Sequence, residues 1–180
     1  EVVGLTHDFA KLTRWAQKHL RGEAFQHPDG YRYHAFPGAL ITLYCLLECR
    51  DEVGDYAAGV ATLVVAGHHD TQSPPEPSKL AENYGRTTVE VRETYERVNE
   101  QLEDIGDEVS ERADRIIRAA TDGAGSWDDF REWHDDRAEP IDGAHDHLVY
   151  FARMGKGDVG GGYYGDVVRL WTALKLADQT

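Results

Sequence analysis

PGALITLYCLLEC, residues 37–49, is an almost uninterrupted apolar run that is too long for an ordinary β-strand. No proline interrupts it after Pro37, so it predicts a buried helix that begins just after that residue. Further along, residues 51–69 predict a second helix. Its inward face is expected to carry Val53, Tyr56, Ala57, Val60, Leu63 and Val64. Two neighbouring apolar helices indicate an all-α domain.

The rest of the chain extends this helical pattern. Apolar residues recur at helical spacing from residue 2 to 16, which predicts one continuous first helix that ends in a loop after Gly22. Residues 87–120 predict one or two amphipathic helices with a break near Gly106. A short helix is expected around residues 127–133, and a last one over residues 163–178. We see no convincing strand and expect a single domain over residues 1–180.

The composition indicates the environment in which the protein works: its salt concentration, its cellular location and its redox state. Its formal net charge is −14, from 33 Asp and Glu against 19 Lys and Arg, of which only five are Lys. Such an acidic, lysine-poor surface is typical of a halophilic host, where concentrated salt screens the repulsion. No apolar run is long enough to cross a membrane, and no leader precedes the first helix, so a soluble, cytoplasmic protein is expected. Cys45 and Cys49 are expected to be reduced core residues.

Several histidines and aspartates fall near the ends of the predicted helices. Their side chains are the ligand types that bind divalent transition metals, and a carboxylate can bridge two such ions. Two ions held close together can clamp both the attacking and the leaving oxygen of a phosphodiester. These candidate ligands are His7, Asp8, His34, His68, His69 and Asp178.

The order of these residues resembles the HD nuclease domain of the CRISPR type I helicase-nucleases. LTHDFAKLTRWAQKHL (residues 5–20) is similar to that family's H-D-x-x-K helix, and YRYHAFPGALITLY (31–44) to its K-H-S-x-x-S-A segment. AGHHD (66–70) resembles its paired-histidine motif, and LWTALKLADQT (170–180) its closing L-x-x-A-D helix. The resemblance covers nearly the whole chain. It implies a helical HD bundle with the metal site at the helix ends.

The resemblance also implies a role for each matching position. Asp8 would bridge two divalent ions, for which Mn, Ni, Co, Fe and Mg are all candidates. His7 and Asp178 would complete one ion's site, and His34, His68 and His69 the other's. Lys11 would stabilise charge on the scissile phosphate. The family cleaves single-stranded DNA that a helicase domain supplies, after recruitment by an RNA-guided surveillance complex.

Two departures from the family pattern leave alternatives open. The family has a further metal-binding histidine before its H-D motif, whereas only six residues without a histidine precede His7 here. We therefore expect a fragment that is truncated at its N-terminus and belongs to a larger helicase-nuclease. In the second motif, Tyr33 and Ala35 replace the family's Lys and Ser. The alternatives are an HD-type nucleotide or cyclic-nucleotide phosphohydrolase, and a non-catalytic helical interaction module.

Other polar and aromatic residues have simpler explanations. We expect His145 and His147 to lie in a loop or at the start of a helix rather than in a metal site. We expect His27 to be a surface residue rather than a replacement for the family's missing histidine ligand. His134, beside Asp135, predicts an exposed loop. The acidic segment 100–114 predicts a solvated helix face. Base stacking or core packing is possible for Trp127, Trp133, Tyr163, Tyr164 and Trp171.

Overall fold

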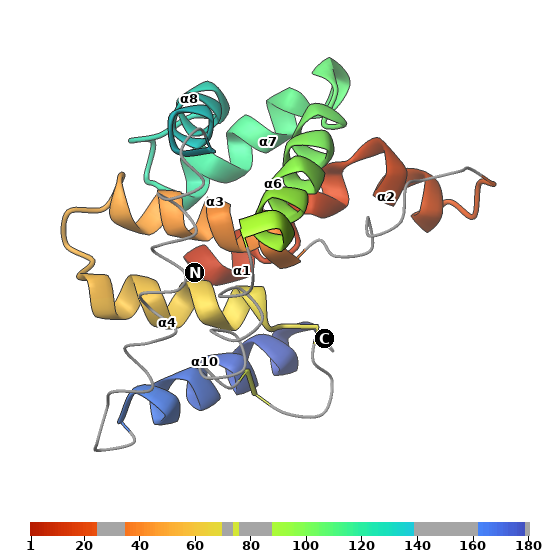
Figure 1. Ribbon diagram of the computed structural model, residues 1–180. Helices are drawn as coiled ribbons and strands as arrows, with labels where there is room; N and C mark the ends of the chain where they lie inside the picture. Colours follow the sequence, from red (N-terminus) through yellow and green to blue (C-terminus); the bar gives the residue numbers. More distant parts are fainter. Residues whose placement is uncertain (25–34, 70–73, 76–87, 139–161, 179–180) are drawn as a thin grey trace.

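Two apolar helices form the centre of the molecule. The computed structural model describes residues 1–24, 35–69, 74–75, 88–138 and 162–178. Helix α3 spans Ala35–Leu47, and every residue from Ala35 to Leu46 is buried. Helix α4 spans Asp55–Ala66 and is buried from Ala58 to Val65. The two helices pack against each other along their length, as expected from their near-continuous apolar sequence (Figure 1).

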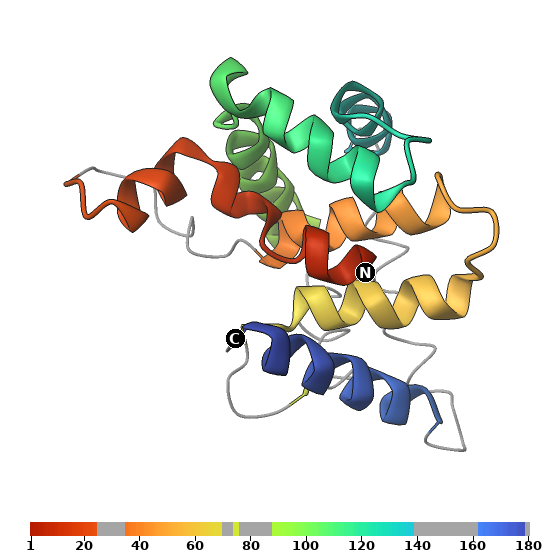
Figure 2. The same cartoon turned by 180° about the vertical axis from the view of Figure 1, so that it is seen from behind.

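The remaining helices pack around this pair. The N-terminal segment forms α1 (Val2–Thr6), the 3-10 helix η1 (Phe9–Leu12) and α2 (Arg14–Leu20). Helices α6 (Thr88–Glu103), α7 (Asp107–Ala120) and α8 (Trp127–Ala138) lie beyond α3, and α10 (Gly162–Asp178) packs on the opposite side of α4 (Figures 1 and 2). All regular elements in the described residues are helical, which confirms the all-α prediction.

Two sequence-based helix predictions need correction. The first helix is not continuous but divides into α1, η1 and α2. The central helix α4 begins at Asp55 rather than Asp51, because Gly54 serves as its N-cap in an extended conformation. Tyr56 and Ala57 therefore lie in its exposed first turn instead of on the inward face, and Tyr56 is 43% exposed. The break between α6 and α7 does occur at Gly106, the N-cap of α7.

Most of the aromatic residues that were candidates for base stacking belong to the core. Trp127 is buried and packs against Phe9 and Phe130. Trp133 contacts Tyr44 and Phe130. The remaining aromatic candidates lie on α10: Tyr163 is buried, Trp171 packs against the core, and Tyr164 is exposed.

The cysteines agree with the prediction. Both are free, Cys45 is buried, and Cys49 is partly buried. Burial raises the pKa of the Cys45 thiol to about 12, so it stays protonated at neutral pH. Among the described residues, none of the helices is long and apolar enough to cross a membrane.

His134 is a core residue of α8, which contradicts the prediction of an exposed loop. Its side chain is buried, its ring stacks on Phe130, and its Nε2 lies 2.6 Å from Oδ1 of Asn99. Burial lowers the pKa of His134, because a charged imidazolium is poorly solvated there. The prediction was wrong because it was based on the polar neighbour Asp135. Asp135 is exposed, whereas Phe130 and His134 lie on the face of α8 that turns inward.

This burial predicts a pH-dependent stability. The unfolded chain protonates His134 below its ordinary pKa of about 6.5, whereas the folded chain resists protonation. The free energy of unfolding is therefore unaffected by His134 above that pH and decreases as the pH falls below it. We expect the loss in unfolding free energy between pH 7 and 5 to be smaller in His134→Leu, by at most about 2 kcal/mol. Urea titrations of both proteins at each pH measure this difference, and equal losses would contradict it.

Candidate metal centre

His7 and Asp8 lie in a turn between α1 and η1 rather than on a helix. The backbone leaves the α-helical conformation at Asp8, whose φ and ψ are −101° and 14°. A 3-10 turn follows, in which the Lys11 amide donates to the Asp8 carbonyl. Thr13 is extended, and its hydroxyl accepts a hydrogen bond from the Ala16 amide to cap α2. These local bonds hold the backbone of the N-terminal segment in three short elements.

Close packing against α3 holds this turn in place. A Cβ atom on Gly38 would lie only 2.6 Å from the His7 carbonyl oxygen and 2.9 Å from that of Thr6. Only glycine lets the first turns of α3 approach these carbonyls so closely. One turn later, the hydroxyls of Thr6 and Thr42 are hydrogen-bonded at 2.6 Å. The start of α3 therefore fixes where His7 and Asp8 lie.

The paired histidines follow α4, which ends at Ala66 rather than at His69 as predicted. Gly67 caps the helix and packs tightly against Pro75. His68 is buried in the turn that follows, whereas His69 is exposed. The rings of His68 and His69 are 4.1 Å apart between centroids, and His68 also meets the ring of His7 edge-on at 5.4 Å. Three histidines from two distant parts of the chain thus lie side by side.

Backbone contacts determine which nitrogen of His7 and His68 faces Asp8. Nδ1 of His7 lies 3.2 Å and 3.1 Å from the carbonyl oxygens of Val3 and Gly4, and Nδ1 of His68 lies 2.6 Å from that of Val65. A carbonyl only accepts, so each Nδ1 carries a proton and donates it. In the neutral rings, each Nε2 then presents a lone pair. This is the arrangement that a histidine needs to bind a metal through Nε2.

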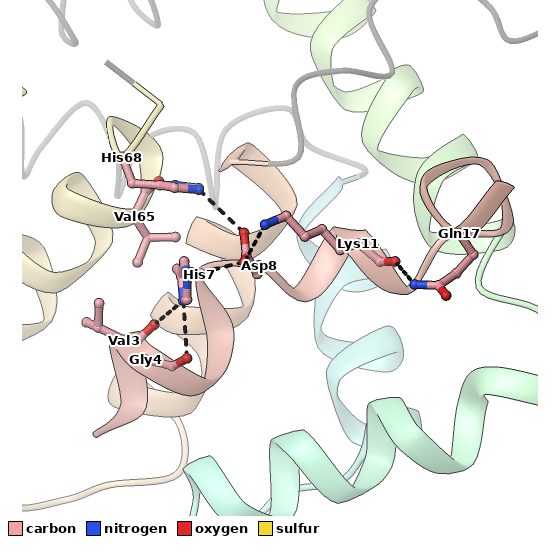
Figure 3. A network of polar contacts seen from close by, with 8 residues as sticks. All are labelled: Val3, Gly4, His7, Asp8, Lys11, Gln17, Val65 and His68. Atoms are coloured by element: carbon pink, nitrogen blue, oxygen red, sulfur yellow. Dashed lines mark hydrogen bonds and ion pairs between the residues drawn. The ribbon is translucent and has the colours of Figure 1, made fainter. Parts of the chain in front are cut away.

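Asp8 lies beside both of these imidazoles (Figure 3). Its Oδ2 is 3.4 Å from Nε2 of His7, and its Oδ1 is 3.8 Å from Nε2 of His68. Each carboxylate oxygen therefore faces a different histidine. Three groups that only accept protons or cations converge here, and a positive charge among them would offset their mutual repulsion.

Lys11 brings such a charge to the same carboxylate. Its Nζ lies 2.5 Å from Oδ2 of Asp8, and the two side chains are 43% and 34% exposed. Lys11 comes from η1, one turn after the aspartate, so the 3-10 helix directs its ammonium back toward Asp8 (Figure 3). The site thus combines a cation at its open edge with buried imidazoles on its inner side.

The donor set suits a divalent metal, although the described residues do not complete a site. Two donors bound at about 2.1 Å to one tetrahedral ion lie about 3.4 Å apart, close to the separation of His7 and Asp8. Nevertheless, no group of three or more His, Cys, Asp or Glu side chains within the described ranges is placed to hold an ion. His34, His27, His145 and His147 lie outside those ranges.

Asp178 is the last residue of α10, and its side chain is also outside the described part. Figures 1 and 2 both show the last turn of α10 beside the segment that follows α4. The C-terminal end of α10 therefore lies at the same end of the bundle as the C-terminal end of α4.

The comparisons with known proteins identify one relative. The CRISPR-associated nuclease/helicase Cas3 of Haloferax volcanii is 30% identical to this chain over an alignment of 136 residues that covers 73% of the chain. The chain is therefore related to a region of a CRISPR-associated nuclease/helicase. The match spans only 13% of the Haloferax protein's length. No family model and no solved structure matches the chain.

Proposed function

We propose that this chain is an HD-type, metal-dependent nuclease that cleaves single-stranded DNA during CRISPR type I interference. The observation that carries the proposal is the position of Asp8, with a histidine Nε2 facing each of its carboxylate oxygens. The similarity to a nuclease/helicase supports the same chemistry. Since the match covers a small part of that relative, a helicase domain and an RNA-guided surveillance complex as partners belong to the proposal.

Asp8 would be shared by two divalent ions, and its neighbours would complete the two sites. His7 and Asp178 would help to hold one ion, and His34, His68 and His69 the other. When bound, the ions would activate the attacking water and offset charge on the phosphodiester. The chain's part is to hold the ligands ready: the backbone carbonyls of Val3, Gly4 and Val65 orient the imidazoles before any ion arrives.

Lys11 has a separate role in this proposal. Its ammonium pairs with Asp8 at the exposed edge of the site, where a phosphate would approach. There it would bind a non-bridging oxygen of the scissile phosphate and stabilise the added charge of the transition state. We expect Lys11→Gln to lower the single-turnover cleavage rate about a hundredfold while its metal content stays unchanged. A parallel loss of metal, measured by elemental analysis, would show instead that Lys11 supports the metal site.

The test of the proposed function is cleavage of circular single-stranded DNA. Protein stripped with a chelator is incubated with the labelled circle at high salt, with Mn, Ni, Co, Fe or Mg added singly. We expect metal-dependent linearisation of the circle. Because a circle has no end for an exonuclease to attack, this result would identify an endonuclease. Hydrolysis of a mononucleotide or cyclic nucleotide without cleavage of the circle would replace the proposal with a phosphohydrolase. Inactivity toward all of these substrates would favour a non-catalytic module.

A further inference from the structure

A basic segment stands next to the metal centre in an otherwise acidic chain. Residues 9–22 contain four of the 19 Lys and Arg residues and none of the 33 Asp and Glu residues. These cations are Lys11, Arg14, Lys18 and Arg21. The segment comprises η1 and α2, so it begins immediately after Asp8.

Helix α2 projects from the bundle as an arm. None of its seven residues is buried, and Figures 1 and 2 show it extending away from the central helices. Arg14, Lys18 and Arg21 are spaced i, i+4 and i+7, which places them on one face of the helix. The side chain of Gln17 donates a 2.7 Å hydrogen bond to the Lys11 carbonyl, which ties the arm to the site (Figure 3).

Polar contacts anchor the base of the arm in place of a hydrophobic face. The Trp15 amide donates to Oδ2 of Asp104 at 2.9 Å, and Nε of Arg14 lies 3.3 Å from the other oxygen of that carboxylate. Asp104 is buried, although the sequence predicts a solvated acidic face there. Arg14 thus has a structural partner, whereas Lys18 and Arg21 lie farther along the arm.

Arg21, the outermost cation of the arm, is accessible to a ligand, and Lys18 is partly exposed. Arg21 pairs with Glu23 at 2.5 Å, but their side chains are 58% and 47% exposed. Such an exposed ion pair contributes little to stability, so another anion can readily take the place of Glu23. Residues 9–22 contain Lys and Arg but no Asp or Glu, and such a segment complements the phosphates of nucleic acid, in contrast to the net charge of −14 of the whole chain.

We propose that residues 9–22 bind the backbone of single-stranded DNA and guide it to Asp8. The row of cations runs from Arg21 along α2 to Lys11, which contacts Asp8 itself. The strand would thus pass over α2 before it reaches the metal centre. This inference rests on the proposed nuclease function for its substrate, but DNA binding by the arm requires neither metal nor cleavage.

The test measures binding without catalysis. Fluorescence anisotropy of a labelled oligodeoxythymidine is followed in chelator, over the salt range in which circular dichroism shows folded protein. We expect Lys18→Gln/Arg21→Gln to bind about tenfold more weakly at the lowest salt. The slope of log K against log salt should fall by about 1.4, as two phosphate contacts are lost.

A matched control removes one Arg and one Lys from α10. Arg169 pairs with Asp166 at 2.6 Å, much as Arg21 pairs with Glu23, and Lys175 is the second cation of that helix. Arg169→Gln/Lys175→Gln should bind DNA within about twofold of the unmodified chain. Equal effects of the two double variants would overturn the assignment to α2, because net charge alone would then explain the loss.

Two further outcomes would overturn the inference. One is an unmodified chain that does not bind the oligodeoxythymidine. The other is a clear preference for the matching oligouridine, which would make the arm an RNA-binding surface. Failure of the proposed function itself would look different, because DNA would still bind but would not be cleaved when metal is added.

Discussion

Asp8→Asn should lower the rate of metal-dependent DNA cleavage by about a thousandfold. The substitution keeps the shape of the side chain but removes the charge that both neighbouring imidazoles face. A bound metal provides several kcal/mol of transition-state stabilisation, and each 1.36 kcal/mol corresponds to a factor of ten in rate. The fold should survive, because the lost pair with Lys11 is partly exposed and contributes less than about 1 kcal/mol. Single-turnover cleavage of a labelled single strand measures the effect.

The matched control for this prediction is Asp166→Asn. Asp166 also pairs with a cation three residues later, Arg169, and it lies on α10 away from the histidines. We expect Asp166→Asn to cleave DNA at nearly the rate of the unmodified chain. Cleavage that survives in Asp8→Asn at a similar rate would show that the bridging-carboxylate mechanism is wrong.

Gly38→Ala should damage both stability and activity. The new Cβ would lie 2.6 Å from the His7 carbonyl oxygen, and that neighbour is backbone that cannot rotate away. We expect a loss of about 1–3 kcal/mol in unfolding free energy, as is typical of overpacking. A shift of the turn would also misplace His7 and Asp8, so activity should fall even when the protein is folded. Urea denaturation and cleavage are measured on the same samples.

Gly165→Ala provides the control for the added methyl group. Gly165 lies within α10, and a Cβ there would meet nothing within 4 Å. Alanine in an exposed helix is more stable than glycine by about 0.5–1 kcal/mol, so this variant should gain stability and retain activity. If Gly38→Ala were equally harmless, close packing of α3 would not be what positions His7 and Asp8.

The predictable parts of the fold are those where composition leaves few options. Helix α3 follows from a run that is apolar on every side, and the break at Gly106 follows from a glycine between two amphipathic stretches. The division of the first helix was not predictable from spacing. It depends on the extended backbone of Thr13 and on the approach of Gly38 from a distant part of the sequence. Tertiary contacts of this kind override local propensity.

In the site, too, the residues with a local sequence signal were predicted, and those that depend on tertiary contacts were not. The His–Asp and His–His pairs were visible in the sequence, and the structure brings His7, Asp8, Lys11 and His68 together. The supporting residues were missed. Asp104 looked like part of a solvated face, yet it caps the base of α2 from the loop before α7. Gly38 looked like one small residue in an apolar run. Neither role has a local signal, because each depends on a partner far away in the sequence.

The most direct test of the central claim is the metal content of the unmodified chain and of Asp8→Asn after equilibrium dialysis against Mn²⁺. A centre that depends on Asp8 predicts one or two ions per unmodified chain by elemental analysis, and a clear loss of bound metal in the variant. Asp166→Asn should retain the full content. Equal metal binding by all three proteins, or none by the unmodified chain, would contradict the assignment of Asp8 to a metal centre.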